Sequence, residues 1–426
     1  LYRMNGENMI EIVDFFNEVY LSKIKNKSEL FIGVELEYPI VNSSGGPTSI
    51  QVAKDLFRFL FEELHFEILK TDSDGNPIEL LTEDKDVILF EVTYNTLEFA
   101  FNKASRIQDV DSRLQYYLTH IQAFLGKYGH ELQGKGINPG WKVNDYRPVA
   151  IGRYKMLMNY LNLSQQFKNM HPFPQYAGFI CGNQVQIDVE KETFLRVINA
   201  FNKIEAVKAY LFANSEFELL GNMTISRDYF WEESMHGLLK ENVGVYPFDF
   251  ESESDYIAYK SQSAMFYVER KGEYYYFLPM KIDEYLAAKK VQVYTVSGES
   301  LLISPQVEDL KTHRSYHYQE LTRRGTIEFR SVCTQPFDRT FAPTAFHLGL
   351  IYNLEQLEEI LKKSVFYQEY GNDYIYLRKK FTAKILPQKD KGIIHHFSKD
   401  ILNCAYAGLK NRGFGEEIYL ESILIK

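Results

Sequence analysis

The sequence predicts an α+β protein in which helices pack on the apolar side of one sheet. Short segments alternate apolar residues with Glu, Gln or Arg, as half-buried strands do, at residues 31–39, 89–92, 96–101, 181–189 and 325–332. Stretches with the period of amphipathic helices lie between and after them. Hydrophobic residues make up 45% and charged residues 25% of the 426-residue chain, which are the proportions of a globular protein.

Residues 31–39 carry two glutamates, Glu35 and Glu37, that a strand would aim at the same face. Val34 and Leu36 would then point the other way, towards a core. Two carboxylates on one face repel each other. A divalent metal between them would remove that repulsion, because hard cations bind carboxylate oxygens. The simpler interpretation is a half-exposed antiparallel strand with its polar residues outside.

The same arrangement recurs in the other candidate strands. Their polar positions are Glu91, Glu98, Gln184, Gln186, Asp188, Glu328 and Arg330. If the strands share one sheet, these groups gather on one surface, which suits Mg²⁺ ions and nucleotide phosphates. Several unrelated, solvent-facing strands are the alternative.

Helices are predicted where apolar residues recur every three to four positions. The predicted ranges are 7–20, 49–64, 105–126, 191–214 and 341–363. Ser105 and Gln108 would form a capping box at the start of the third of these helices. No linker or repeat interrupts the chain. We therefore expect a single catalytic domain over residues 1–426, with a mostly helical part from 341 to 426.

Charge and cysteine content restrict the partners and the compartment. The formal net charge of −9, from 48 basic and 57 acidic residues, argues against nucleic acid as the main partner. The longest apolar runs are too short to span a membrane, and no signal peptide precedes the first predicted helix. Cys181, Cys333 and Cys404 are widely spaced, as reduced thiols are, and form no zinc motif. We expect a cytoplasmic protein without nucleic-acid or membrane partners.

Several stretches, taken together, resemble the glutamate–cysteine ligases, in particular the branch shared by plants and many bacteria. The matching stretches lie at residues 33–37, 97–99, 136–141, 152–156, 184–188, 211–215, 226–227 and 327–330. Glu-x-Glu and Glu-x-Arg are common motifs on their own. The order and spacing of the stretches across residues 31–340 are what make the resemblance specific.

This resemblance implies a glutamine-synthetase-like catalytic fold, in which a curved, mostly antiparallel sheet forms a funnel-shaped active site with helices packed outside. It implies an enzyme that uses ATP as co-substrate to phosphorylate the γ-carboxylate of L-glutamate. The amine of L-cysteine would then displace phosphate, which is the first step of glutathione-type thiol synthesis. Two or three Mg²⁺ ions, with Mn²⁺ as an alternative, would serve as cofactors. A monomer or homodimer is expected.

The resemblance also implies roles for individual residues. Glu35, Glu37, Glu91, Glu98 and Glu328 would surround the Mg²⁺ ions. Arg330 would act on the transferred phosphoryl group, and Arg227 would bind a substrate carboxylate. The remaining substrate- or ATP-binding residues would be Arg153, Gln184, Gln186 and Trp231. Purely structural roles are the alternatives: Arg330 paired with a glutamate of the sheet, Arg227 at the surface near Asp228, and Arg153 bound to a loop carbonyl.

The acceptor amine is the least specified part of this hypothesis. Met158 stands where plant-like members commonly have arginine, and Glu269 stands where an aromatic residue is usual. Both changes are expected to touch a substrate pocket and to alter its preference. A sister ligase with another amine acceptor, or a non-catalytic binding homologue, are the alternatives. Because an acyl phosphate is prone to hydrolysis, the site is expected to close through the loops at 134–148 or 170–178.

Overall fold

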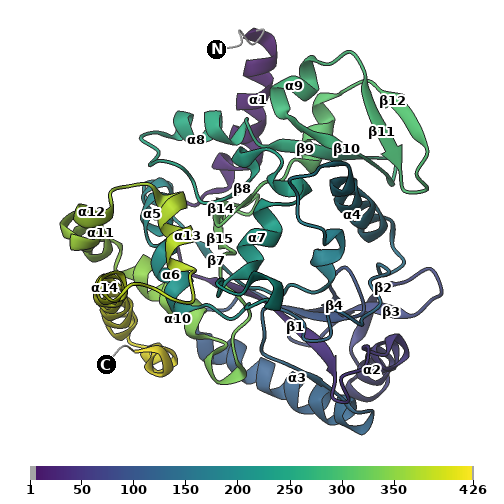
Figure 1. The fold of residues 1–426 in the computed structure, drawn as a ribbon, viewed down its shortest axis with the longest axis horizontal. Coiled ribbons are helices and arrows are strands. Elements are labelled where there is room, and N and C mark those ends of the chain that lie inside the picture. Colours follow the sequence, from purple (N-terminus) through teal and green to yellow (C-terminus); the bar gives the residue numbers. More distant parts are fainter. Residues whose placement is uncertain (1–5, 425–426) are drawn as a thin grey trace.

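A curved sheet of nine strands lies at the centre of the computed structural model, which describes residues 6–424 (Figure 1). Every pair of neighbouring strands in this sheet is antiparallel. The strand order is β14 (Gln319–Leu321), β15 (Thr326–Phe329), β7 (Asn183–Asp188), β1 (Ile32–Asn42), β5 (Thr96–Ala100), β4 (Val87–Phe90), β3 (Pro77–Leu81) and β2 (Glu67–Thr71), while β6 (His130–Leu132) pairs with the end of β1. The predicted α+β class and the mostly antiparallel sheet are confirmed.

One face of this sheet is apolar and is covered by helices. In β1, Val34, Leu36 and Tyr38 are fully buried because they alternate with the glutamates and point towards the core. The helix α3 (Ile107–Lys127) packs on β5, where the rings of Tyr117 and Phe99 lie 6.3 Å apart. The helices α5 (Phe194–Lys203) and α10 (Ala342–Tyr352) cover β15, β7 and β1. The opposite face, which carries the glutamates, is therefore left free of these helices.

The remaining elements surround the sheet. The helices are α1 (Gly6–Val19), α2 (Ile50–Leu64), α4 (Gly152–Asn162), α6 (Glu205–Leu211), α7 (Ser226–Glu232), α8 (Glu253–Lys260), α9 (Ile282–Ala287), α11 (Leu354–Lys363), α12 (Val365–Tyr370), α13 (Tyr374–Phe381) and α14 (Gln388–Arg412). A second, antiparallel sheet has the order β12 (Ser300–Ile303), β11 (Val291–Thr295), β10 (Glu273–Lys281) and β9 (Ala264–Arg270), and β13 (Tyr316–His317) pairs in parallel with β8 (Val243–Gly244). In Figure 1 the second sheet lies at the upper right and the C-terminal helices lie at the lower left.

Two predicted long helices are each broken into two. The range 191–214 contains α5 and α6, which meet at Ile204, and the range 341–363 contains α10 and α11, which meet at Asn353. After the break at Ile204, Glu205 and Lys208 become almost fully buried and form an ion pair of 2.6 Å. Apolar periodicity predicted one helix over 191–214, but periodicity does not reveal a bend, and α6 packs against α13, which is distant in sequence.

The predicted capping box at Ser105 is wrong. Helix α3 begins at Ile107, and no side chain of its own N-terminal segment caps it. Instead, the backbone N–H of Ile107 donates to Oε1 of Glu416, 2.9 Å away and more than 300 positions later in the chain. The other oxygen of Glu416 pairs with Arg412 at the end of α14. A buried carboxylate therefore joins the start of α3 to the C-terminal helix.

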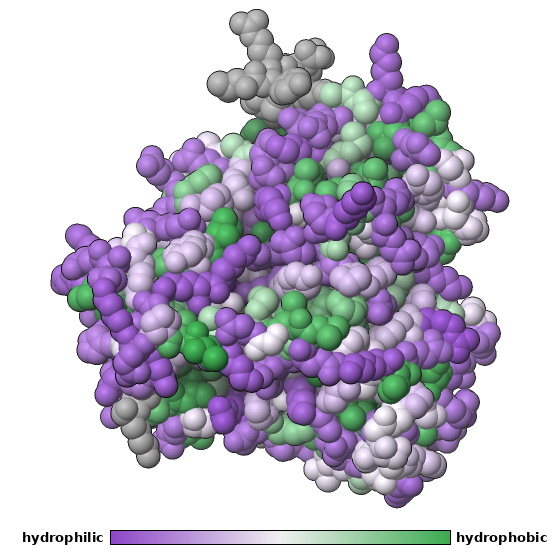
Figure 2. Space-filling model, in the orientation of Figure 1, coloured by the Kyte–Doolittle hydropathy of each residue, from purple (hydrophilic) through white to green (hydrophobic). Residues whose placement is uncertain are grey.

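Apolar and hydrophilic residues are interspersed on the face of the molecule shown in Figure 2, where the apolar residues form small groups between hydrophilic ones. Within residues 6–424, none of the helices has both the length and the apolar composition that a membrane crossing requires.

Replacing Glu416 with alanine is expected to destabilise the protein by about 3–5 kcal/mol, because it uncaps α3 and leaves the buried guanidinium of Arg412 without its carboxylate partner. Urea unfolding at 25 °C measures the change. The matched control is Glu359→Ala, which removes an exposed pair with Lys363 and should cost less than about 1 kcal/mol. Equal effects of the two substitutions would show that the long-range cap is unimportant.

Candidate active site

The register of the central sheet brings the predicted polar residues together. Residues directly opposite each other on antiparallel strands point to the same side of a sheet. Glu37 lies opposite Glu98, and Glu35 lies opposite Gln184. Continuing across the sheet, Gln186 lies opposite Glu328, which in turn lies opposite Glu320. We call these residues the acidic face: Glu35, Glu37, Glu98, Gln184, Gln186, Glu320 and Glu328.

Glu91 joins the acidic face from outside the strands. It was predicted within a strand over 89–92, but β4 ends at Phe90 and Val92 has a φ of 61°. This left-handed residue turns the chain sharply. The side chain of Glu91 is held by the hydroxyl of Tyr154, which donates to its Oε2 over 3.0 Å. Glu91 thereby lines the same cavities as Glu37.

Amide groups donate to the carboxylates at the centre of the acidic face. The backbone N–H of Gly182 donates to Glu37 Oε2 over 2.6 Å. The side-chain amides of Gln184 and Gln186 donate to Glu37 and Glu35 over 3.2 and 3.1 Å. These neutral donors only partly offset the negative charge. The carbonyl oxygen Oε1 of Gln184 is buried and has no protein partner among the described residues.

Burial and mutual repulsion raise the pKa values of Glu35, Glu37 and Glu98. Burial raises the pKa of Glu35 to about 7, and Glu328 adds to the rise. Burial also raises the pKa of Glu37 to about 7, against the opposing effect of Arg227. The pKa of Glu98 is raised well above its ordinary value by burial and then by Glu91. A divalent cation would compete with these protons for the carboxylate oxygens and would relieve the repulsion between them.

The donor set suits a hard divalent ion. Carboxylate oxygens and an amide oxygen are the ligands that Mg²⁺ and Mn²⁺ prefer. Within the described residues, no group of three His, Cys, Asp or Glu side chains already converges to hold a metal ion. The assignment of Glu35, Glu37, Glu91, Glu98 and Glu328 as metal ligands therefore stays a prediction.

Arg227 and Arg330 lie against the acidic face. Arg227, at the start of α7, is 6% exposed, so the alternative of a surface arginine is wrong. Its Nη1 donates to the carbonyl of Val332 over 3.0 Å, and its Nε is buried without a partner among the described residues. Arg330 pairs with Glu328, as the structural alternative required, yet its Nε is likewise buried without a partner. Both guanidinium groups retain N–H donors for a ligand.

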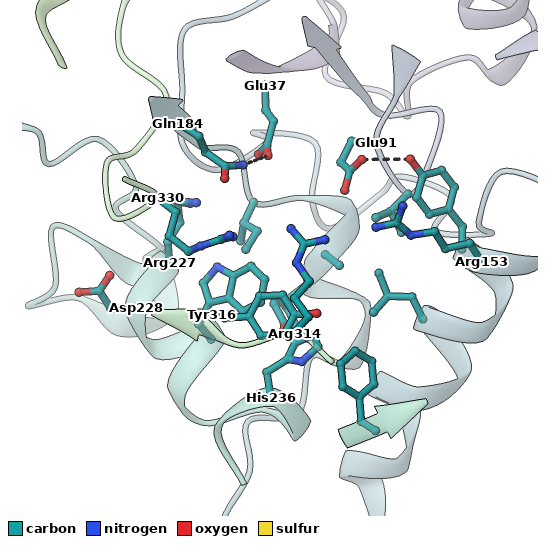
Figure 3. A pocket seen from close by; sticks show the side chains of 18 of the residues that line it. Glu37, Glu91, Arg153, Gln184, Arg227, Asp228, His236, Arg314, Tyr316 and Arg330 are labelled. Atoms are coloured by element: carbon teal, nitrogen blue, oxygen red, sulfur yellow. Dashed lines mark hydrogen bonds between the residues drawn. The ribbon is translucent and has the colours of Figure 1, made fainter. Parts of the chain in front are cut away.

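Arg314 is a third arginine of the site and was not predicted from the sequence. Figure 3 shows its guanidinium in the middle of the cavity. Arg314 and Arg330 both lie over the ring of Tyr316, at 5.4 and 5.8 Å from its centroid. Residues 314–320 contain arginine, histidine, tyrosine and glutamate within seven positions. This concentration of polar and aromatic side chains was the one feature of the sequence that could have indicated a site residue here.

Two adjoining cavities share these residues. The inner cavity, of about 130 Å³, is lined by Trp231, Tyr316, His236, Phe266, Met156 and Tyr176, with Arg227 and Arg314 at its polar end. The rings of Trp231 and Tyr316 lie 5.0 Å apart in this wall. The outer cavity, of about 480 Å³, is lined by the acidic face and by several arginines. Arg153, exposed at the start of α4, lines both cavities, as do Arg330 and Gln184.

Not all of the segments expected around the site line its cavities. The loop 134–148 contributes no residue to either cavity, and its Trp141 packs instead against Phe217 with ring centroids 4.5 Å apart. Met156 and Leu157 line the inner cavity, whereas Met158 does not. Glu269 lies on β9 opposite Tyr274 and lines neither cavity. The loop 170–178 does contribute Tyr176 and Ala177, and its closure stays a prediction.

Comparison with known proteins identifies the family of the chain. The family model described as "Glutamate-cysteine ligase family 2(GCS2)" matches residues 31–384. The chloroplastic glutamate–cysteine ligase of Brassica juncea is 24% identical over 415 residues, which cover 94% of this chain and 76% of that protein. The chloroplastic enzyme of Arabidopsis thaliana is also 24% identical, with coverage of 94% and 74%.

Among solved structures, the glutamate–cysteine ligase of Francisella tularensis in complex with AMP is 11% identical. It matches with a TM-score of 0.41 over 94% of this chain and 88% of that chain. A TM-score this low supports no comparison of the two sites. The match of the family model over residues 31–384 is the result that assigns the family: the chain belongs to glutamate–cysteine ligase family 2, a family of ligase enzymes.

Proposed function

We propose that this protein joins the γ-carboxylate of L-glutamate to the amine of L-cysteine at the expense of ATP. In the first step a γ-carboxylate oxygen attacks the γ-phosphorus of ATP, the bond to ADP breaks, and γ-glutamyl phosphate forms. In the second step the cysteine amine attacks the acyl carbon, phosphate leaves, and the nitrogen loses a proton. The product is γ-glutamylcysteine. Family membership and the joining of an acidic face to a cluster of arginines support this proposal.

The acidic face fits the divalent ions that such a reaction uses. Glu35, Glu37, Glu98 and Glu328 from the strands, with Glu91 from the turn, would hold them. Bound there, Mg²⁺ or Mn²⁺ would neutralise charge on the phosphates of ATP. Strand positions suit this role because they hold carboxylates more rigidly than loops do. Oε1 of Gln184, which is buried and has no partner among the described residues, would be a further metal ligand in this set.

The arginines supply the fixed positive charge. Phosphoryl transfer has a loose transition state, so positioning and charge neutralisation account for most of its catalysis. Arg330 and Arg314 both lie over the ring of Tyr316 and line both cavities. They would contact the transferred phosphoryl group. Arg227 would bind a carboxylate of the amino-acid substrate at the polar end of the inner cavity. Arg153, Gln186 and Trp231 would complete the substrate and nucleotide contacts.

The small inner cavity suits an amino acid. Its aromatic wall would influence which amine is accepted in the second step. A sister ligase that joins another amine to glutamate is the second candidate function. The retained carboxylates and arginines argue against a non-catalytic homologue. A single catalytic unit over residues 1–426, a monomer or homodimer, and a cytoplasmic location remain predictions.

The release of ADP tests the function directly. With Mg²⁺, ATP and L-glutamate present, the full chain is expected to release ADP only when L-cysteine is added. The amount of ADP should equal the amount of γ-glutamylcysteine formed. Coupled spectrophotometry measures ADP, and mass spectrometry identifies the dipeptide. ADP release that depends on another amine would support the sister ligase. No ADP with any amine of a broad panel would contradict both.

Divalent-metal affinity is expected to rise with pH. Because Glu35 and Glu37 have a pKa of about 7, the folded metal-free protein holds more protons than the unfolded chain between about pH 4.5 and 7. Its stability should therefore fall as pH rises through this range, and bound metal should restore it. Between pH 6 and 8, Mn²⁺ affinity should increase about 10-fold for each carboxyl group that must lose its proton.

Isothermal titration calorimetry in buffers of different ionisation enthalpy measures both the affinity and the protons released. Glu35→Gln and Glu328→Gln should each weaken metal binding and lower kcat/KM by at least about 100-fold. Metal affinity that does not change with pH, or full activity of either variant, would contradict the metal assignments.

Gly182 is expected to be required for the position of Arg227. A Cβ atom added to Gly182 would lie 2.5 Å from Nη2 of Arg227, so Gly182→Ala should displace this guanidinium from the inner cavity. The KM for the amino acid that Arg227 binds should rise at least about 10-fold. The control is Gly221→Ala, whose added methyl group meets nothing within 4 Å. Unchanged kinetics of Gly182→Ala would remove Arg227 from substrate binding.

A further inference from the structure

Glu320 occupies a place on the acidic face that is equivalent to those of the predicted metal ligands. It lies on β14 directly opposite Glu328, so the two side chains point to the same side of the sheet. Glu320 also lines the outer cavity together with Glu35, Glu37 and Glu98. By position alone it would be a sixth carboxylate for divalent ions, yet its immediate partners differ from those of the other five.

The partner of Glu320 is a buried lysine. Lys260, the last residue of α8, is 1% exposed, and its ammonium group forms an ion pair with Oε1 of Glu320. The hydroxyl of Ser315 donates to the same carboxylate oxygen and accepts from the ammonium group. The C-terminal end of a helix favours a cation, which adds to the attraction. Among the six carboxylates, Glu320 is the one that pairs with a lysine within residues 6–424.

Neighbouring arginines have other partners. Arg330 pairs with Glu328, and Arg323 donates to the carbonyls of Leu310 and His313 over 3.4 and 3.3 Å. The charge of Glu320 is therefore balanced by Lys260 from the adjacent helix. Ser315 lies between Arg314 and Tyr316, so the same contacts also hold the segment that presents both residues to the cavities.

We propose that Lys260 is a built-in cation of the acidic face, which removes Glu320 from the set of carboxylates that bind divalent ions. The ammonium group is attached to the chain and neutralises the β14 end of the face, whereas the other carboxylates depend on exchangeable ions. Burial lowers the pKa of Lys260, and the adjacent carboxylate of Glu320 favours its charged form. This inference rests on the proposed function, because it assumes that divalent ions bind at the remaining glutamates. Lys260 is a positioning residue in this proposal, and it contacts no substrate.

Counting bound Mn²⁺ ions tests the proposal. Electron paramagnetic resonance of the full chain, titrated with Mn²⁺ alone, gives the number of bound ions without reference to activity. Glu320→Gln is expected to bind as many ions as the unmodified protein, with affinity within about threefold. Lys260→Met frees Glu320 to face Glu328 without a counter-charge, and it should bind one additional ion. The double variant Lys260→Met/Glu320→Gln should lose that additional ion.

The control is Lys384→Met, which removes an exposed pair with Glu216 and should leave the count unchanged. Loss of one ion in Glu320→Gln would overturn the proposal, and so would an unchanged count in folded Lys260→Met. If Lys260→Met does not fold, Glu320→Gln decides alone. The number of bound Mn²⁺ ions should fall if Glu320 is a metal ligand and should stay the same if Glu320 only pairs with Lys260. If the unmodified protein binds no Mn²⁺, both the metal assignment of the proposed function and this proposal fail. If it binds Mn²⁺ but a variant gives one of the contradicting counts, only the role of Lys260 fails.

Discussion

Mutual repulsion among carboxylates on the central sheet is the constraint on which the site depends. The register of β1 with β5 and β7 places Glu35, Glu37 and Glu98 at neighbouring positions on one face of the sheet. All three are partly buried and have raised pKa values. A protein surface with this much negative charge needs positive partners. Every element that faces it supplies donors or cations: amides from β7, arginines from α7 and β13–β15 and their flanks, and a lysine from α8.

A second, buried charge network joins the segments that carry Arg227 and Arg330. Arg378 of α13 is 1% exposed and binds Asp228 and Glu205 over 2.7 and 2.6 Å. It also donates to the carbonyl of Ser331 over 3.2 Å. Asp228 and Ser331 directly follow Arg227 and Arg330 in the chain. One guanidinium thus ties the two segments that present the site arginines to each other, and breaking such a network is costly because it strands buried charge.

The sequence predicted elements well where their signal was local. The alternation in residues 31–39 and 181–189 became β1 and β7, and the apolar stripe of residues 105–126 became α3 within two residues. Predictions failed where distant contacts decided the outcome. Glu416 replaced Ser105 as the cap of α3, and the ion pairs of Glu205 with Lys208 and with Arg378 of α13 accompany the break between α5 and α6.

The sequence by itself determined which side chains could form the acidic face, because strand alternation separates Glu35 and Glu37 from Val34 and Leu36 whatever lies beside them. The tertiary structure alone decided which strands are neighbours and in what register, and so which carboxylates meet. It also decided that Arg314 enters the site and that Lys260 pairs with Glu320. These contacts join residues that are dozens to hundreds of positions apart, and the periodicity of a segment carries no information about partners at that distance.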